Sequence, residues 1–458
     1  MCIKMQNLKV SFIPCGVHVE VIDSFGRPFI DYQMLEKAAN SLRKIGLEVY
    51  EHKDFVRVKK DAIKAIKSSE EEDVDCIILY AATWLWASEI VGAVRFTSRP
   101  ILVWTAPISQ GWATGGAMVL HGTLDEVGIK HKFVYGFPDN PETMKKIKAY
   151  VKAAKAVRKL RQTTVGLIGG FSMGAFTGRV DEAQWMEKFG INIDHMDQYM
   201  IIRTAESIPK EEVIKEYEKV KNLIDNVPPL DDVMEKSIRI YLAMKRIIEQ
   251  NKFNVTALKC FPELGDHYAT ACLSQSLLGD EGFISACIGD LNTALSAYIL
   301  HLLSGSPIFS PDVQLVRKEE GIVKLTSDGA CPLSFAKNVK EVKLSRRGIF
   351  GEGEADGICV GFVCKPGIVT LARLCRIKGR YYLHIAVGEA YEPSKEKLEE
   401  ELNACGFPYW PHAFIKLRGN VEDFIQNQRS EYISMCYGDL KEELLDLCYL
   451  LDIEPLVA

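Results

Sequence analysis

The sequence predicts an α/β protein with two doubly wound α/β domains and a C-terminal antiparallel β domain, either a barrel or a sandwich. Strand and helix patterns alternate until about Pro307, as expected for βαβ units around parallel sheets. Beyond Pro307 the pattern changes to short β-forming runs separated by glycine. The chain has 458 residues, and about 150 residues per domain favours three domains.

The first domain is expected over residues 1–163. Apolar runs predict five parallel strands, at 8–14, 46–50, 76–80, 101–104 and 132–135. Helical patterns lie between them, at 32–44, at 58–67 and after Gly115. Four of the six tryptophans, Trp84, Trp86, Trp104 and Trp112, fall near these strand ends. We interpret each of them as a core or subunit contact in preference to a contact with a ligand.

The second domain is expected over residues 164–306, with strands at 165–168, 255–258 and 283–287 and helices at 208–224 and 230–249. Glycines crowd the segment 166–178, which follows the first of these strands. Their spacing is not Gly-x-Gly-x-x-Gly, so a nicotinamide cofactor is not expected. This loop is interpreted as a place where backbone approaches a small ligand.

The third domain is expected over residues 307–458. Its clearest strands are at 358–364, 368–375 and 381–386, and a helix at 438–451 closes the chain. Trp410 and His412 open a further strand near the C-terminus, where an aromatic–Pro–His turn modestly favours a ligand-binding role.

Composition excludes several classes of protein. The net charge of −5 supplies no basic field for nucleic acid. The apolar stretch 76–94 contains Glu89 and fits a buried strand and helix, so no membrane span or secretory signal is expected. The 13 cysteines are scattered without Cys-x-x-Cys spacing, which favours reduced thiols in the cytoplasm and disfavours a zinc site.

Two carboxylates stand where ligands bind in doubly wound sheets, beyond the carboxyl ends of strands. Glu263 follows the strand that ends at Leu258, and Asp290 follows the strand that ends at Cys287. Two convergent carboxylates suit a hard cation such as Mn²⁺ or Mg²⁺, and one of them could transfer protons. The alternative is that such acids cap the following helices.

Several segments together resemble the L-fucose/L-arabinose isomerase superfamily, especially its shorter fucose-isomerase-like members. They include Val165-Gly-Leu-Ile-Gly-Gly, Lys259-Cys-Phe-Pro-Glu-Leu, Ala286-Cys-Ile-Gly-Asp, Leu325-Thr-Ser-Asp-Gly-Ala-Cys-Pro and Lys365-Pro-Gly-Ile-Val-Thr-Leu-Ala-Arg-Leu. They follow the family order over nearly the whole chain. The resemblance implies two Rossmann-like doubly wound α/β domains followed by a C-terminal β-barrel domain.

The resemblance also implies an activity. Family members interconvert aldoses and ketoses through a cis-enediol, with Mn²⁺ or another divalent cation polarising the sugar carbonyl. By position, Glu263 and Asp290 look like the paired metal ligands and acid/base groups, while Met173, Ser327 and Trp410 resemble sugar-pocket positions. Family members form trimers or hexamers, so the resemblance implies a homo-oligomer. The expected small-molecule ligand is a sugar substrate.

Two departures from the family pattern alter this expectation. Tyr432 occupies the place of the family's third metal ligand, a histidine, and Ile288 stands where many relatives have Glu. The metal could be held by Glu263, Asp290 and water, or with help from Glu431 or His412. Three hypotheses remain: a metal-dependent ketol isomerase, a diverged homologue that binds a sugar or sugar-like anion without isomerising it, and a different enediolate reaction in the same pocket.

Overall fold

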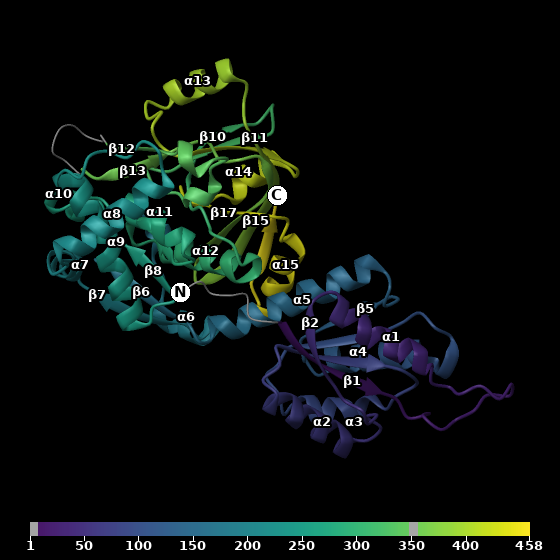
Figure 1. Cartoon of the computed structure of the whole chain (residues 1–458). Helices are drawn as coiled ribbons and strands as arrows, with labels where there is room; N and C mark the ends of the chain where they lie inside the picture. The colour runs from purple at the N-terminus through teal and green to yellow at the C-terminus, as the bar shows by residue number, and fades with distance from the viewer. Residues whose placement is uncertain (1–7, 348–355) are drawn as a thin grey trace. The chain divides into compact units, whose positions relative to one another are not determined.

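The computed structural model describes residues 8–347 and 356–458, which form two compact units. The N-terminal unit comprises residues 8–158 together with 442–451, and the C-terminal unit comprises 159–441 together with 452–458 (Figure 1). The closing helix α15 (Lys441–Leu451) therefore packs almost entirely with the N-terminal unit, although its sequence neighbours belong to the other. Among the described residues, no helix is both long and apolar enough to cross a bilayer.

The N-terminal unit is a parallel five-stranded sheet of order β2-β1-β3-β4-β5. The strands are β1 (Leu8–Cys15), β2 (Leu47–Glu51), β3 (Cys76–Ala81), β4 (Ile101–Thr105) and β5 (His131–Tyr135). The helices are α1 (Tyr32–Lys44), α2 (Lys59–Glu71), α3 (Ala87–Val94), α4 (Ala113–Glu126) and α5 (Pro141–Leu160). This strand order is one of the two common orders of doubly wound folds.

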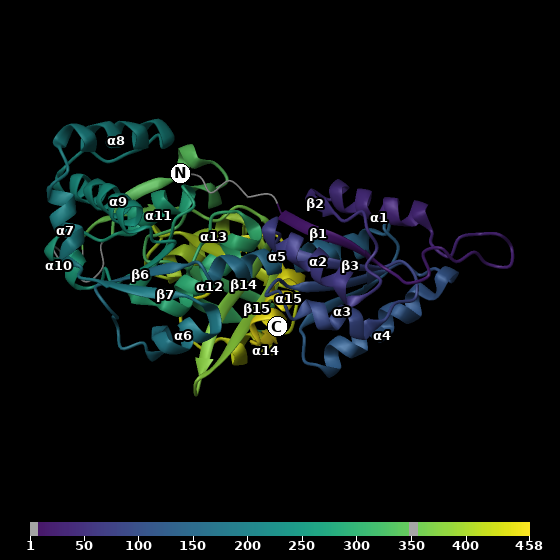
Figure 2. The same ribbon diagram turned by 90° about the horizontal axis from the view of Figure 1, so that it is seen from below.

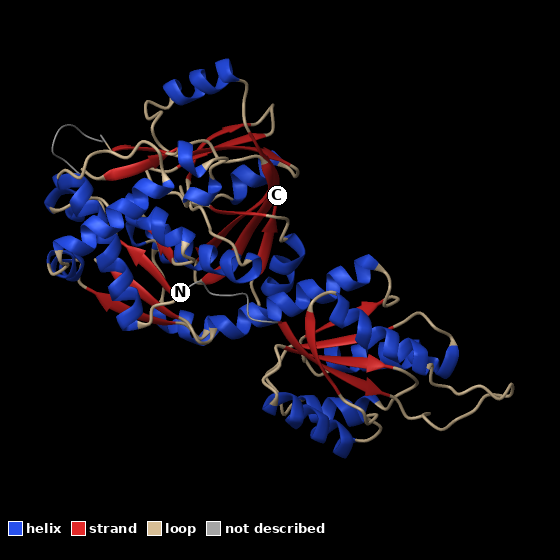
Figure 3. Ribbon diagram, in the orientation of Figure 1, coloured by secondary structure: helices blue, strands red, loops and turns tan. Residues whose placement is uncertain are grey.

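Both faces of this sheet are buried, which explains the continuous apolar strands. Ile77 and Leu79 of β3 pack in one cluster with residues of α2, α3 and α4. Ile78 and Tyr80, which point to the opposite face, pack with residues of α1 and α5. Figure 3 shows helices on the two sides of the sheet.

The C-terminal unit begins with a second parallel sheet, of order β7-β6-β8-β9. The strands are β6 (Thr164–Ile168), β7 (Asn192–Met196), β8 (Val255–Leu258) and β9 (Ile284–Ala286). The helices are α6 (Glu182–Phe189), α7 (Tyr199–Glu206), α8 (Lys210–Leu223), α9 (Asp232–Asn251), α10 (Glu263–His267), α11 (Cys272–Asp280) and α12 (Leu291–Ser304). The predicted strands are thus present, and β7 is an addition that sequence patterns had not indicated.

A separate antiparallel sheet follows, ordered β10-β11-β16-β15-β14-β17, with β18 paired in parallel to β15. The strands are β10 (Asp312–Arg317), β11 (Ile322–Thr326), β14 (Gly367–Ile377), β15 (Arg380–Tyr391), β16 (His412–Leu417), β17 (Ser434–Tyr437) and β18 (Glu454–Val457). A hairpin of β12 (Lys343–Arg346) and β13 (Ile358–Gly361) stands apart, and α13 (Lys395–Ala404) and α14 (Val421–Asn427) are helical insertions. Figure 2 shows the long β14–β15 pair beside α12, which contacts β14.

The expected closed barrel is not found in the described residues, because no ladder joins the end strands β10 and β17. A register shift between Val313 and Leu315 marks a bulge in β10, which redirects that strand. Only isolated bridges link the two edges, pairing Phe309 with Met435 and Asp312 with Tyr432. These bridges bring Asp312 and Tyr432 together beside the parallel sheet.

Candidate active site

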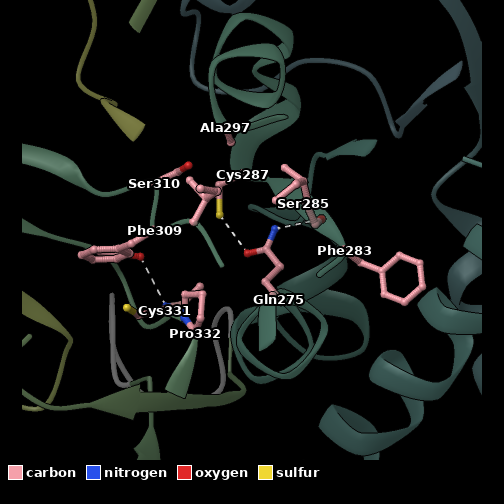
Figure 4. Close-up of a pocket in the computed structure, with 14 residues that line it drawn as sticks. Gln275, Phe283, Ser285, Cys287, Ala297, Phe309, Ser310, Cys331 and Pro332 are labelled. Carbon is pink, nitrogen blue, oxygen red and sulfur yellow. Dashed lines mark hydrogen bonds between the residues drawn. The ribbon is translucent and has the colours of Figure 1, made fainter. Parts of the chain in front are cut away.

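A pocket lies in the C-terminal unit where strand ends of both sheets meet (Figure 4). Its lining comes from α11, β9, the segment before β10 and the segment after β11. The polar lining residues are Gln275, Ser285, Cys287, Ser310, Ser327 and Cys331. The pocket is therefore at the carboxyl end of β9, where doubly wound sheets place their ligands.

Gln275 organises one wall of this pocket. Its Oε1 accepts from the Cys287 thiol at 3.0 Å, and its Nε2 donates to Ser285 Oγ at 3.3 Å. Figure 4 shows the amide between these two residues. Because both ends of the amide have partners, its orientation is fixed and Cys287 is held as a donor.

Titratable side chains surround the pocket. Burial raises the pKa of the Asp312 carboxyl well above its usual value, with the charges of Asp328 and Glu431 acting in the same direction. Burial likewise raises the pKa of the Tyr432 phenol, and Asp312 adds to the rise. Both shifts favour the protonated forms of Asp312 and Tyr432, in which each group can donate a hydrogen bond.

Arg347 is the cation of this region. Its Nη2 pairs with a carboxylate oxygen of Asp328, and its Nε donates to the Asp328 carbonyl at 3.3 Å. Burial opposes its charge, but Asp328 outweighs burial and raises its pKa. Its Nη1 is buried without a hydrogen-bond partner, and its guanidinium lies 5.4 Å from the Phe261 ring centre. Arg347 thus retains one unused donor toward the end of β8.

Cys260, at the end of β8, faces Cys287, at the end of the neighbouring strand. A hydrogen bond from Cys287 lowers the pKa of the Cys260 thiol, against the effect of burial. The same contact raises the pKa of Cys287, and burial raises it further. The titrations of the two thiols are therefore linked, and their contact joins the ends of β8 and β9 at the site.

The glycine-rich loop after β6 is packed against the same strand ends. Ser172 donates its hydroxyl to the Phe261 carbonyl at 2.6 Å and its backbone N–H to the Ile288 carbonyl at 3.1 Å. A Cβ on Gly289 would collide with the Gly170 carbonyl oxygen. The glycines therefore permit a close approach of backbones that connects the ends of β6, β8 and β9.

Glu263 begins the short helix α10, four residues after Lys259. Lys259 Nζ donates to Glu263 Oε1 at 2.6 Å, and this hydrogen bond lowers the pKa of the carboxyl. The Glu263 side chain is 46% exposed, whereas its Oε2 is buried without a hydrogen-bond partner. Glu263 is therefore ionised at neutral pH and accessible from solvent.

Asp290, the other predicted ligand, is enclosed. One oxygen accepts from the Thr293 backbone N–H at 2.8 Å and caps helix α12, and the other lies 2.8 Å from Arg373 Nη1. Asp290 and Arg373 have side chains only 0% and 1% exposed. The carboxylate thus already has a cation and a helix N-terminus as partners.

These two carboxylates do not fit a divalent-cation site as the side chains stand. A metal at Asp290 would compete with Arg373, and a metal at Glu263 would compete with Lys259. Ile288 offers no ligand atom, and a neutral phenol such as that of Tyr432 is a poor one. Among the described residues, three His, Cys, Asp or Glu ligand atoms converge elsewhere, at His121, Asp125 and His131 of the N-terminal unit.

The remaining predicted positions divide into pocket and non-pocket residues. Ser327 lines the pocket, and Tyr432 is buried near Cys287 and Asp312. Trp410 stacks on Phe407 at 4.0 Å and packs with Cys272 and Cys359 behind the Asp328 loop. Met173 is exposed at a positive φ in the glycine-rich loop.

His412 is held by a backbone carbonyl. Its Nε2 lies 3.2 Å from the Phe407 carbonyl, which can only accept, and its Nδ1 is buried without a partner. Burial lowers the pKa of the ring to about 4, so it is neutral at pH 7. The Nδ1 atom therefore carries the lone pair, and replacement of the missing ligand by His412 stays a prediction.

Sequence reasoning missed Lys259, Asp312, Asp328, Arg347 and Gln275. Lys259 had a signal, because it stands at a strand end four residues before Glu263. No such sequence signal marks Asp312, Asp328 or Arg347, because only the bridges and loops of the antiparallel sheet bring them near the pocket.

Neutral and charged acids, a guanidinium and thiols around a pocket at strand ends are typical of an enzyme acting on a small polar molecule. The family model for the C-terminal domain of L-fucose isomerase matches residues 329–457. Sulfoquinovose isomerase from Priestia megaterium is 21% identical, over 99% of this chain and 100% of that protein. The enzyme of that name from Alkalicoccus urumqiensis is 24% identical, over 72% of this chain and 76% of its own.

L-arabinose isomerase 2 from Clostridium acetobutylicum is 22% identical, over 54% of this chain and 55% of that protein. The named relatives are all isomerases of sugars, and their similarity to this chain supports an enzyme. The chain is thus similar to members of the L-fucose/L-arabinose isomerase superfamily, over its C-terminal third in the family model and over nearly its whole length in the sulfoquinovose isomerases.

Proposed function

We propose that the chain is an aldose–ketose isomerase acting on a monosaccharide at the pocket described above. The observation that carries the proposal is similarity to sulfoquinovose isomerases over nearly the whole chain, because it includes every segment that builds the pocket. Sulfoquinovose is therefore the first substrate to test, and L-arabinose and L-fucose follow from the other matches.

Ketol isomerisation moves a proton between C2 and C1 of the open-chain sugar. We assign the base to Glu263, because Lys259 keeps its carboxyl ionised and its side chain is accessible. The carboxylate takes the C2 proton, the C–H electron pair forms the C1=C2 bond, and charge develops on O1. A second proton passes from the O2 hydroxyl to O1. Glu263 returns its proton to C1 as the electron pair of the C1=C2 bond takes it up, and the C=O bond forms at C2.

Charge on O1 requires a nearby cation or hydrogen-bond donor. Lys259 is 2.6 Å from Glu263 and is the first candidate, and the unpaired Nη1 of Arg347 is the second. A resident Mn²⁺ would polarise the sugar carbonyl in the manner that the family resemblance implies. Since Glu263 and Asp290 do not fit such an ion here, no step is assigned to it.

For Asp290 we propose a positioning function, because it holds the N-terminus of α12 against Arg373. Ser327 and Tyr432 are proposed to bind sugar hydroxyls, since both lie at the pocket. Met173, Trp410 and His412 are proposed to shape its surroundings from the glycine-rich loop and the start of β16.

A second function is favoured by particular residues. Tyr432 and Ile288 stand where the family places a histidine and often a glutamate, and Asp290 is neutralised by Arg373. A chain with these substitutions could bind a sugar or sugar-like anion without isomerising it. The pocket would then still contain Gln275, Ser310 and Ser327 as hydrogen-bonding groups.

The deciding experiment measures deuterium uptake at sugar C2 by NMR in D₂O, with sulfoquinovose, L-arabinose and L-fucose as separate substrates. Isomerase activity predicts uptake that disappears in Glu263→Gln and persists in Glu218→Gln, an exposed control on α8 paired with Lys221. Parallel samples with EDTA or added Mn²⁺ report metal dependence. Saturable sugar binding without deuterium uptake would establish the second function instead.

A further inference from the structure

Two histidines and an aspartate converge at the edge of the N-terminal sheet, in the unit that does not contain the pocket. His121 and Asp125 lie one turn apart on α4, and His131 begins the edge strand β5. His121 Nδ1 is 2.6 Å from His131 Nε2 and 3.6 Å from the Asp125 carboxylate. One ligand atom from each of the three residues lies within 4.8 Å of the ligand atoms of the other two.

The protonation state of His131 is set by its surroundings. Its Nδ1 is 2.9 Å from the Ile129 carbonyl oxygen, which can only accept, so Nδ1 carries the proton. The lone pair of Nε2 is therefore directed at His121, which lies 2.6 Å away. Metal-binding histidines have the same arrangement, with the second ring nitrogen donating to a carbonyl.

One ligand is rigid and the other two are adjustable. The His131 side chain is 0% exposed, whereas those of His121 and Asp125 are 39% and 59% exposed. His121 stacks on Phe133 at 4.8 Å, which holds its ring over β5 without enclosing it. Around a tetrahedral zinc ion two nitrogens lie about 3.3 Å apart. A small rotation of His121 away from His131 provides this separation.

We propose that His121, Asp125 and His131 bind a divalent transition-metal ion of the zinc class. Two imidazoles and one carboxylate match the ligand preference of Zn²⁺ and Co²⁺, and Mg²⁺ prefers oxygen ligands alone. The neighbouring charge of Lys132 is matched by Asp446 at 2.6 Å, so it does not oppose a cation here. Exposed positions remain for water, and the ion would link α4 to β5 across residues 127–130.

The site is tested by titrating the full-length, tag-free chain with Co²⁺ and following its visible absorption, then displacing Co²⁺ with Zn²⁺. We expect one equivalent of Co²⁺ with nitrogen ligands, displaced by Zn²⁺ and unaffected by excess Mg²⁺. His121→Ala should weaken Zn²⁺ binding by about tenfold or more, and Asp125→Asn should weaken it less. Both residues are exposed, so the variants are expected to fold, and far-UV circular dichroism checks this.

His195→Ala is the matched control, because His195 is an exposed histidine paired with a carboxylate, Glu182, at 2.7 Å. It should bind Zn²⁺ as the unchanged chain does, and so should Glu263→Gln in the other unit. The proposal is overturned if no stoichiometric Co²⁺ or Zn²⁺ binding occurs below millimolar concentration. It is equally overturned if His121→Ala binds Zn²⁺ with unchanged affinity. Neither result bears on isomerisation at the pocket.

Discussion

The carboxylate of Asp290 lies 2.8 Å from the guanidinium of Arg373, and solvent reaches neither side chain. Asp290 starts α12 at the end of the parallel sheet, and Arg373 lies in the middle of β14 of the antiparallel sheet. Arg373 also donates to the Thr177 carbonyl at 3.1 Å, in the glycine-rich loop. One buried pair therefore connects both sheets and the loop beside the pocket.

Removing either charge should destabilise the C-terminal unit strongly. Arg373→Met leaves the Asp290 carboxylate buried without its cation, which typically costs about 3–5 kcal/mol. Asp290→Asn leaves Arg373 in the same condition. Urea unfolding of the C-terminal unit, followed by fluorescence, should show the midpoint falling in both variants.

The matched control is Arg376→Met, three residues along the same strand. Arg376 is 32% exposed and lies 4.0 Å from Asp181, so its loss should change stability by no more than about 1 kcal/mol. An unchanged midpoint in Arg373→Met would mean that the pair adds nothing to stability, and would return Asp290 to consideration as a free ligand.

Much of the fold could be predicted because parallel strands leave a local signal. The apolar runs at Ile77–Leu79 and Val255–Leu258 are buried on both faces, and this needs no knowledge of distant contacts. The prediction of a closed barrel was not confirmed, because closure depends on how the edges of β10 and β17 meet. Such pairing between strands about 120 residues apart leaves no local pattern in one sequence.

The candidate site was harder to predict because its partners are distant in the chain. Asp290 at a strand end was identified, but its partner Arg373 is contributed by another sheet, and this contact gives Asp290 a structural environment. His121 and Asp125 have helical spacing, yet His131 joins them only because β5 returns beside α4. The sequence disfavoured zinc because it shows no Cys-x-x-Cys and no histidine-rich spacing, and His131 lies outside any such local spacing.

Lys259 should control the pH dependence of isomerisation through Glu263. Its hydrogen bond lowers the pKa of the Glu263 carboxyl, so its removal raises that pKa. A base must be deprotonated, and Lys259→Met should therefore move the acidic limb of kcat/KM to higher pH and lower its plateau. Lys259→Arg keeps the charge and should keep the limb in place. An unshifted limb in Lys259→Met would remove Glu263 as the titrating base.

Acid should destabilise the C-terminal unit through two buried histidines, His384 and His412. Burial lowers the pKa of each to about 4, below the value of about 6.5 in an unfolded chain. Their contribution to the free energy of unfolding is complete above pH 6.5. It is lost as the pH falls from 6.5 to 4, because in this range only the unfolded chain takes up the protons. The loss amounts to at most about 3 kcal/mol for each histidine.

His412→Leu removes one of these groups and should flatten the pH dependence of unfolding over this range. It also removes one of the two hydrogen bonds to the Phe407 carbonyl, which keeps the Trp410 N–H as a donor, so the variant is less stable at pH 7. The measurement is the difference in urea midpoint between pH 7 and pH 4.5, for the unchanged chain and the variant. Equal differences would contradict the neutral buried state of His412.

Oligomerisation can be tested at the tryptophans of the N-terminal unit. Trp104 is fully buried and donates to the Gly136 carbonyl, so it belongs to the core. Trp84 is partly buried and lies at the margin of the core. Trp86 and Trp112 are 52% and 62% exposed, and such apolar exposure favours a protein contact.

We expect the double variant Trp86→Ser, Trp112→Ser to have a lower assembly mass by light scattering after size-exclusion chromatography. Burial of a tryptophan at an interface removes a large apolar surface from water, so the loss of two should weaken subunit association by several kcal/mol. Tyr199→Ser, at an equally exposed aromatic residue of the C-terminal unit, is the control and should leave the mass unchanged. A monomeric unchanged chain, or a double variant of unchanged mass, would exclude this surface as the subunit contact.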